Sequence, residues 1–489
     1  MLSPLFILVP IALAVFGGAA IIPIRFRSDR IRNIYAETIT ILTSVSVWIA
    51  LACCSREPVI VYSFIEGFSM SFKIDGPAML FAGMISIMWP FVILYAFDYM
   101  EHAARKSVFF AFYVMTYGIT LGVACAHNLV TMYVFFEMLT LVTIPLVGFY
   151  EDHESMFAAR RYAAYCIGGA SMGFFAVVMA TLDGGGEFVY GGNLSDVFSD
   201  TLMRVVFLFG FFGFGTKAAV FPLHSWLPLA GVAPTPVTAL LHAVAVVNSG
   251  VYAVMRLTWY DFGPEFLLGS GIQEFCVLVS AFTLVFAAAM ALKERHFKRR
   301  LAYSTVSNLS YMLFGIMLLT PEGLLAGMAH MLFHGVIKMS LFLCAGAFLH
   351  VTGHAYIFEI NGAGRKMPWI FTFYTLAALS LTGIPLFCGF ISKWKLIMAG
   401  LEASRRLGTA GAFALIVAAF LCAVYTLSIS IRAFFPAKGT DRFVLLPGHQ
   451  AEPKRMLIPI AFFGIVNILL GLFPEPVVRF LSAIVQGQL

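Results

Sequence analysis

Seven ionisable side chains lie in stretches of sequence that are otherwise apolar. They are Glu137, Lys217, His242, His330, His334, Lys338 and Lys393. An ionisable group at bilayer depth is energetically costly and usually marks a functional site. One buried histidine alone is more often a hydrogen-bonded packing residue, and one Glu–Lys pair can simply hold two helices together. Seven such groups in one chain favour a function, and carboxyl, imidazole and amine groups together suit proton transfer.

The spacing of His330, His334 and Lys338 is the most informative of these patterns. Side chains four residues apart share one helix face and are separated by about 6 Å along the axis. Imidazole titrates near neutral pH, and an amine shielded from water approaches that range. Two histidines at this spacing can also bind zinc. A third ligand is missing nearby and Lys338 would repel the cation, so we expect a proton relay with no metal and no cofactor.

Both Lys217 and Lys393 lie beside helix breakers. The segment after the first lysine contains Pro222, His224 and Pro228, and the segment before the second contains Gly383, Pro385 and Gly389. Broken helices at equivalent places in two halves indicate the ion path of a transporter built from repeats. The two lysines are about five helices apart, which predicts two five-helix repeats, 107–256 and 265–432. An odd number of helices per repeat makes the repeats inverted.

The composition indicates the class of fold that must position these groups. Hydrophobic residues make up 61% of the 489 residues, charged residues only 11%, and the mean hydropathy is +0.91. Soluble proteins have about 25% charged residues, so a water-soluble surface could not be covered. This excludes a cytoplasmic enzyme, a nucleic-acid binder and a secreted disulfide scaffold. The eight cysteines form no CxxC pair and are interpreted as small buried residues. The sequence predicts an all-α polytopic membrane protein with one membrane domain, 1–489.

Fourteen apolar runs are long enough to cross a bilayer. They are 4–23, 33–53, 77–97, 107–126, 129–150, 162–182, 201–220, 234–256, 265–292, 301–319, 324–350, 368–391, 408–432 and 456–473. The first run has no preceding positive charge and is interpreted as an uncleaved span. If the N-terminus is outside, 20 of the 31 Lys and Arg residues lie in inside segments and 7 in outside segments. This positive-inside pattern predicts a multi-pass protein of the inner membrane of a prokaryote, with both termini on the outer side. A small β-hairpin is expected around Glu66-Gly67 at the outer surface.

Several motifs resemble a known family. They are FEMLTLVTIPLVGF around Glu137, FGTKAAVFPLHSWLP, APTPVTALLHAVAVVNSGVYAVMRL, KRRLAYSTVSNLSYM, the run from His330 to Lys338, and GIPLFCGFISKW. Over about residues 75–435 the chain resembles the antiporter-like subunits of respiratory complex I. The same family includes the large subunits of multisubunit sodium/proton antiporters and of membrane-bound (group 4) hydrogenases. The segment after Glu137 is more similar to the hydrogenase and antiporter branch than to the quinone-reducing branch.

The resemblance implies a role for each candidate residue. It implies that Glu137 pairs with Lys217, that Lys338 with its two histidines forms the central relay, and that Lys393 leads to the outer half-channel. His242 matches a histidine that some members carry on the eighth span. Many members have a lysine on that span where this chain has Asn248, so the central role there would fall to His242, with Asn248 holding a water molecule.

We expect a proton-translocating subunit of a redox-driven membrane complex. No site for a redox cofactor is recognisable, so the expected partners are other membrane subunits, a peripheral redox module, lipid, and protons with sodium as an alternative ion. A multisubunit sodium/proton antiporter without a redox partner is the second hypothesis. A structural subunit with relict charges is the third, and a quinone-site enzyme is disfavoured because no loop offers a headgroup site.

Overall fold

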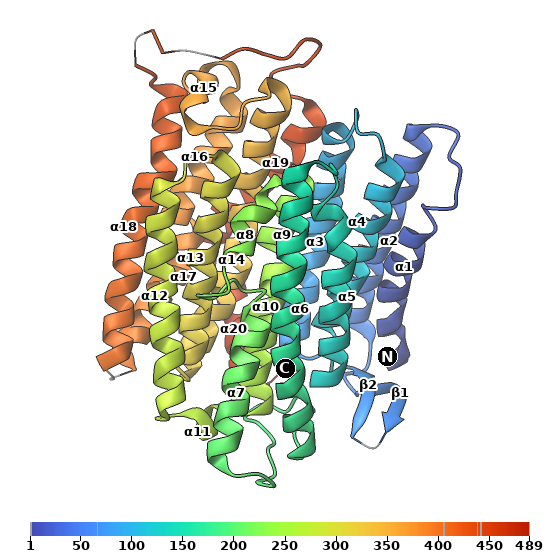
Figure 1. Cartoon of the computed structure of the whole chain (residues 1–489), viewed down its shortest axis with the longest axis vertical. Helices are drawn as coiled ribbons and strands as arrows, with labels where there is room; N and C mark the ends of the chain where they lie inside the picture. Colours follow the sequence, from blue (N-terminus) through green and yellow to red (C-terminus); the bar gives the residue numbers. More distant parts are fainter. Residues whose placement is uncertain (1, 66, 404–405, 438, 441–442, 489) are drawn as a thin grey trace.

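Long helices run between two opposite ends of the molecule (Figure 1). The computed structural model describes residues 2–65, 67–403, 406–437, 439–440 and 443–488. Within lipid every backbone N–H and C=O must be bonded inside its own segment, so apolar runs of this length form helices. In the described part of the chain, ten helices are long and apolar enough to cross a membrane, and Pro4–Ala19 and Pro368–Thr382 are shorter apolar helices. The all-α membrane fold is confirmed; the number of fourteen spans and the inverted repeats stay predictions.

The N-terminal part of the chain forms the helices η1 Pro4–Ile7, α1 Leu8–Ala19, α2 Asp29–Cys53, α3 Gly76–Tyr99, α4 Lys106–Ala124, α5 Leu129–Val147 and α6 His153–Leu182. Two antiparallel strands, β1 Val59–Ile65 and β2 Phe68–Phe72, form the expected hairpin between α2 and α3. Glu66, at its turn, lies outside the described residues.

The middle of the chain is broken into shorter pieces. These are α7 Asp200–Gly215, α8 Trp226–Leu229, η2 Ala230–Val232, α9 Thr235–Ala243, α10 Val246–Arg256, η3 Leu257–Asp261 and α11 Pro264–Leu267. The expected span 234–256 falls within the long apolar segment Thr235–Asp261. Its helix is interrupted after Ala243 and resumes at Val246.

The C-terminal part contains α12 Gly271–Lys293, α13 Phe297–Met317, α14 Pro321–Thr352, η4 Ile357–Glu359, α15 Ala363–Lys366, α16 Pro368–Thr382, α17 Cys388–Glu402, α18 Arg406–Phe434, α19 Lys454–Leu472 and α20 Glu475–Val485. The expected span 368–391 is divided between α16 and α17. Helix α14 and the α9–α10 segment are the most completely buried of the long apolar segments that the structure describes, and together they form the centre of the bundle.

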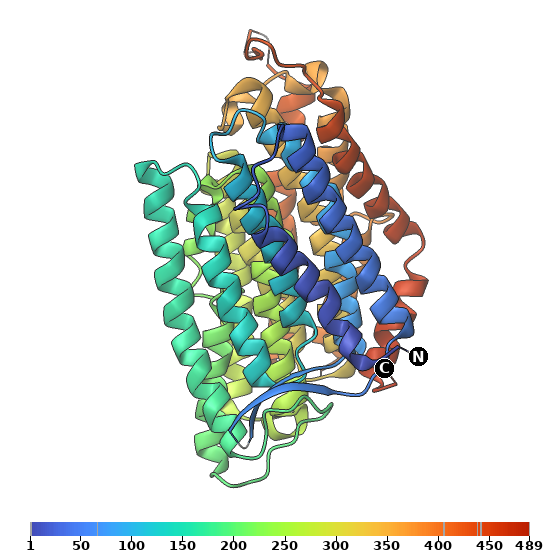
Figure 2. The ribbon, with the colours of Figure 1, turned by 90° about the vertical axis from the view of Figure 1, so that its right-hand side faces the viewer.

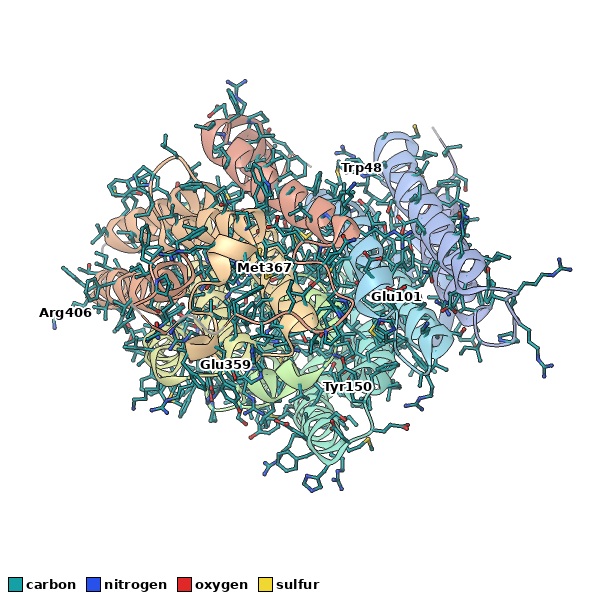
Figure 3. The ribbon with its side chains drawn as sticks, turned by 90° about the horizontal axis from the view of Figure 1, so that it is seen from above. Trp48, Glu101, Tyr150, Glu359, Met367 and Arg406 are labelled. Atoms are coloured by element: carbon teal, nitrogen blue, oxygen red, sulfur yellow. The ribbon has the colours of Figure 1, made fainter. Side chains whose placement is uncertain are left out.

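Both chain ends lie at the same end of the molecule, close to the hairpin (Figures 1 and 2). We call it the terminal end. At the opposite end lie α15 and the segment that joins α18 to α19, and we call this the basic end. Figure 3 looks onto the basic end, where Glu101, Tyr150, Glu359 and Met367 lie on its connections. Of the residues in the charge count, Arg405, Lys438 and Arg442 lie outside the described part of the chain.

Candidate functional site

Helix α7 stops in the middle of the bundle, as the prolines that follow it predict. The chain is unwound from Thr216 to Ser225, and its freed backbone groups find partners on neighbouring elements. The Trp226 indole N–H donates to the carbonyl oxygen of Thr216 at 2.8 Å, and the Phe221 N–H donates to the hydroxyl of Thr283 on α12 at 3.2 Å. The break is therefore a fixed feature held by hydrogen bonds from both sides.

Lys217 lies at the start of this break and is fully buried. Its ammonium group donates to the carbonyl oxygen of Phe136 on α5 and lies 3.5 Å from the centre of the Phe136 ring. The expected ion pair with Glu137 is not among the ion pairs that the described residues form. The physical reason is that the backbone carbonyl and the ring face of the preceding residue already satisfy the ammonium group. Glu137 is half-buried, and its Oε1 has no hydrogen-bond partner in the described part of the chain.

Helix α10 packs directly against the Lys217 break. Gly250 makes this contact, because a Cβ atom at this position would lie 2.4 Å from the backbone nitrogen of Ala218. Only a residue without a side chain permits this approach. The break after α7 is therefore in contact with α10.

His242 lies in the last turn of α9 and is fully buried. Its ring stacks on Phe342 of α14, with 4.7 Å between ring centres, and neither ring nitrogen has a hydrogen-bond partner in the described chain. After the interruption, the Asn248 side-chain amide donates to the carbonyl oxygen of Ala243 at 2.8 Å, which replaces a lost helical hydrogen bond. The Asn248 Oδ1 atom is buried and faces no described hydrogen donor.

The three ladder residues on α14 are all buried. His330 shares hydrogen bonds with the Ser392 hydroxyl at 2.9 Å and with the Asn308 side-chain oxygen at 3.2 Å. The ring of His334 follows, with 6.0 Å between the two ring centres, and neither of its nitrogens has a partner among the described residues. One turn further along, the Lys338 ammonium group donates to the Leu301 carbonyl oxygen at 3.1 Å and to the Ser304 hydroxyl.

The second break separates α16 from α17. Gly383 ends α16 with φ +98°, a conformation that a residue with a side chain rarely adopts. The Gly389 N–H donates to the Ser380 hydroxyl at 3.1 Å. Lys393 lies inside α17, yet its ammonium group reaches back and donates to the Leu381 carbonyl oxygen of α16 at 2.5 Å.

Lys393 and the ladder meet at one aromatic ring of α13. The Lys393 ammonium group lies 4.9 Å from the centre of the Tyr311 ring. The ring of His330 stacks on that of Tyr311, with 5.4 Å between the two ring centres. The second break is therefore connected to the first residue of the ladder through Tyr311.

His224, expected as a supporting residue, is not brought to the relay. It is half-buried between the rings of Phe221 and Phe286, with ring centres 5.6 and 5.2 Å away. It therefore packs the unwound segment against α12.

Sequence reasoning missed the lysine at the start of α13. The charge pattern treats Lys298 as a surface charge of the inside cluster, but it is only 3% exposed and donates to the carbonyl oxygen of Ala233, just before α9, at 2.7 Å. Sequence reasoning also missed that α13 supplies Ser304, Asn308 and Tyr311 to the relay. The signal is present in the motif KRRLAYSTVSNLSYM, where these polar residues recur at helical spacing.

Buried ring nitrogens without protein partners need water, because an unsatisfied buried polar group is costly. His242 and His334 present four such nitrogens at the centre of the bundle, and Asn248 adds an oxygen. Within the described residues, no group of three or more His, Cys, Asp and Glu residues is placed to hold a metal ion. The chemistry that this arrangement offers is the uptake and release of protons by buried imidazole and amine groups.

A family model described as "NADH:quinone oxidoreductase/Mrp antiporter, TM" matches residues 126–426, which includes every candidate residue above. The chain belongs to this family. It is 31% identical over 444 residues to a Na(+)/H(+) antiporter subunit of Alkalihalophilus pseudofirmus, covering 84% of this chain and 53% of the relative. It is 29% identical over 417 residues to a probable K(+)/H(+) antiporter subunit of Rhizobium meliloti, covering 83% and 40%. The chain thus spans about half the length of these curated relatives.

Two solved structures share the fold. A chain of the Mrp complex from Dietzia sp. superposes with a TM-score of 0.85 at 23% identity, covering 98% of this chain and 52% of that chain. A chain of the archaeal membrane-bound sulfane sulfur reductase superposes with a TM-score of 0.84 at 22% identity, covering 99% and 96%. Both structures are membrane complexes, so this family fold occurs in larger assemblies.

Proposed function

We propose that the chain carries protons within a multisubunit cation/proton antiporter. The observation that carries the proposal is that the buried His242 of α9 stacks on Phe342 of α14, one turn beyond Lys338 on the helix that carries the His330–His334–Lys338 ladder. The relatives named as Na(+)/H(+) and K(+)/H(+) antiporter subunits support the antiporter over the redox-driven complex that the sequence first favours.

The proposed route has three parts. Lys217 exchanges a proton with His242 across the contact between α10 and the first break, which Gly250 makes close. The α14 ladder then carries it through Lys338, His334 and His330. The proton then reaches Lys393, whose ammonium group lies over the same Tyr311 ring that stacks on His330.

The basic end faces the cytoplasm in this proposal. The support is the excess of Lys and Arg in the segments at that end, following the positive-inside rule. Lys298 then lies on the cytoplasmic side of α9, and we propose that it takes part in proton exchange there, since it is buried and bonded only a few residues from the start of α9.

The relay supplies a path but no energy, because moving one charge against 100 mV takes about 2.3 kcal/mol. In an antiporter the energy comes from the opposing gradient of sodium or potassium ions. The assembled complex in proteoliposomes should therefore move protons when a sodium or potassium gradient is imposed and no redox substrate is present. Lys338→Met should abolish that flux while the complex still assembles; normal flux in this variant would refute the relay.

The redox-driven complex is the second candidate function. It is kept because the same fold is found in a chain of the archaeal sulfane sulfur reductase, which is a respiratory complex. Here an imposed cation gradient alone would move no protons, and flux would require electron transfer in a partner. The same vesicles, tested with each driving force in turn, separate the two candidates.

A further inference from the structure

Arg256, in the last turn of α10, is a fixed charge that the relay does not use. Its side chain is fully buried and lies within 5.1 Å of the ring centres of Phe188, Tyr252 and Tyr260. The charge pattern of the sequence treats it only as an outside charge. A guanidinium group stays protonated in proteins and can hand on no proton, so its role must come from its charge.

The partner of this charge comes from a distant part of the chain. Asp75, which caps α3, accepts from both terminal nitrogens of Arg256, at 2.6 and 2.5 Å. The Tyr252 hydroxyl accepts from Nε at 2.9 Å and itself donates to the Ala124 carbonyl oxygen at 2.8 Å. Every part of the guanidinium group is therefore held, and this two-bond geometry leaves it little freedom to move.

On the outward side of this pair the molecule is open. Asp75 lines a pocket of about 380 Å³ at the terminal end, together with His127, Glu187 and Tyr260. His127 is 7% exposed and its Nδ1 has no partner in the described chain. The pocket therefore admits water and protons up to Asp75.

On the inward side, α10 leads to the centre of the relay. Asn248, Tyr252 and Arg256 are spaced four residues apart, so they lie on one face of α10. The Asn248 side-chain amide bonds across the interruption to the carbonyl oxygen of Ala243, the residue after His242, and its Oδ1 has no partner in the described chain. Arg256 thus lies between the polar centre and the outer pocket, about 12 Å from Asn248 along the helix axis.

We infer that the Arg256–Asp75 pair is an electrostatic seal that keeps protons from passing between His242 and the outer pocket. The inference rests on the proposed proton route. A fixed cation in a narrow path raises the barrier for a second cation, as arginines do in other selective pores. Asp75 holds the charge in place, and Tyr252 orients it. Protons then leave the centre only along α14 toward Lys393, and no proton leaks through the outer pocket without transport.

The effect of the seal is large enough to measure. A unit charge about 12 Å from a proton, at an effective dielectric constant near 20, changes a crossing rate about tenfold. A proton that passes the guanidinium group comes closer than this, so about tenfold is the lower limit of the effect.

The test is passive proton leak through the assembled complex in proteoliposomes. An acid pulse outside the vesicles drives protons inward, with a permeant anion to compensate the charge, with neither sodium nor potassium present and with no redox substrate, and a trapped dye reports the pH. We expect Arg256→Gln to raise the leak about tenfold or more, and Arg256→Lys, which keeps the charge, to stay near the native rate. Adding His242→Gln to Arg256→Gln should remove the excess leak, because the path then lacks its inner acceptor.

Arg204→Gln is the matched control. This arginine is also at the terminal end, in an ion pair with Asp200 at 3.5 Å and near the Phe266 ring, but it is partly exposed. Its loss should leave the leak unchanged. If Arg256→Gln does not assemble, Tyr252→Phe keeps the ring and removes the hydroxyl that orients the guanidinium group, and it should still raise the leak.

Two results would overturn the seal. One is a native leak rate in an assembled Arg256→Gln or Tyr252→Phe complex. The other is an excess leak that survives the loss of His242, since protons would then bypass the centre. Failure of the proposed function is a separate result, because it is measured as gradient-driven flux in Lys338→Met.

Discussion

The buried ammonium group of Lys217 is bonded to the backbone of Phe136, the residue before Glu137, and not to the Glu137 side chain. The carboxyl group of Glu137 is thus free to change its charge without breaking the contact that places Lys217. A lysine held by a backbone carbonyl and a ring face stays in position while its electrostatic surroundings change. This arrangement suits a switch better than a structural ion pair does.

Replacing Glu137 by Gln should therefore leave assembly intact and lower gradient-driven proton flux at least about tenfold, since a unit charge within about 12 Å contributes about 1.4 kcal/mol or more at an effective dielectric constant near 20. Flux in proteoliposomes and the yield of assembled complex are the two measurements. Glu265→Gln is the control, because Glu265 is an exposed carboxylate at the start of α11. A strong loss of assembly in Glu137→Gln would show that the carboxylate is structural.

Substitutions of Lys338 can show whether this residue exchanges protons or acts only through its positive charge. Lys338→His keeps a titrating group next to the Ser304 hydroxyl and should retain partial flux. Lys338→Arg keeps the positive charge, but a guanidinium group releases no proton near neutral pH, so this variant should fail. Gradient-driven flux in proteoliposomes measures both variants. Equal flux with Arg and Lys would mean that the residue acts only through its field.

The two hydrogen bonds of His330 predict different effects on flux for substitutions of His330 and of its partner Ser392. His330→Gln can keep polar contacts to Ser392 and Asn308 but cannot titrate, so flux should be lost while the melting temperature in detergent stays near the native value. Ser392→Ala removes one hydrogen bond worth about 1 kcal/mol and should leave most of the flux. The opposite order of effects would assign His330 a packing role.

Acidic conditions should lower the stability of the folded chain through His127, a residue of the outer pocket that lies in the connection between α4 and α5. Burial lowers the pKa of His127, and Lys73 lowers it further, while Glu187 and Asp75 oppose the change and Arg256 adds a smaller decrease. The folded state then binds fewer protons than the unfolded state, so stability falls as pH drops below about 6.5. His127→Gln should lose less thermal stability than the native complex between about pH 8 and pH 5. An identical loss in both would show that His127 does not contribute.

The orientation of the chain can be tested with single cysteines at exposed positions. Val197→Cys reports the terminal end and Lys366→Cys the basic end, in a background where the exposed Cys53 is replaced by serine. An impermeant thiol reagent added outside the cell should label position 197 and not 366. Labelling of 366 alone would reverse the proposed orientation. Lys298 is unsuitable as a reporter because it is buried.

The sequence predicts the two helix interruptions beside Lys217 and Lys393, because prolines and glycines lie at these positions. It does not predict the third, since the segment from His242 to Asn248 contains neither residue type. That break depends on a side chain replacing a backbone donor, when the Asn248 amide bonds to Ala243. A local pattern in the sequence cannot show which of the two donors the carbonyl oxygen will use.

Contacts between distant segments are the other part that the sequence does not reveal. Asp75 and Arg256 are 181 residues apart, and each looks like an ordinary loop or helix-end charge by itself. Lys298 is hidden in a cluster of basic residues that the positive-inside rule already explains. The ladder on α14 is predictable, because its geometry depends on one helix only.

The α9–α10 interruption has fixed points on both sides. Lys298 holds the segment just before α9 through the Ala233 carbonyl oxygen, and Asp75 holds the far end of α10 through Arg256. With both ends clamped, movement of this segment is concentrated in the joint at residues 244 and 245. A neighbouring protein that touches either end of the bundle would then feel almost no displacement when the centre changes state. Coupling between such neighbours would then depend on changes in the electric field and not on displacement of this segment.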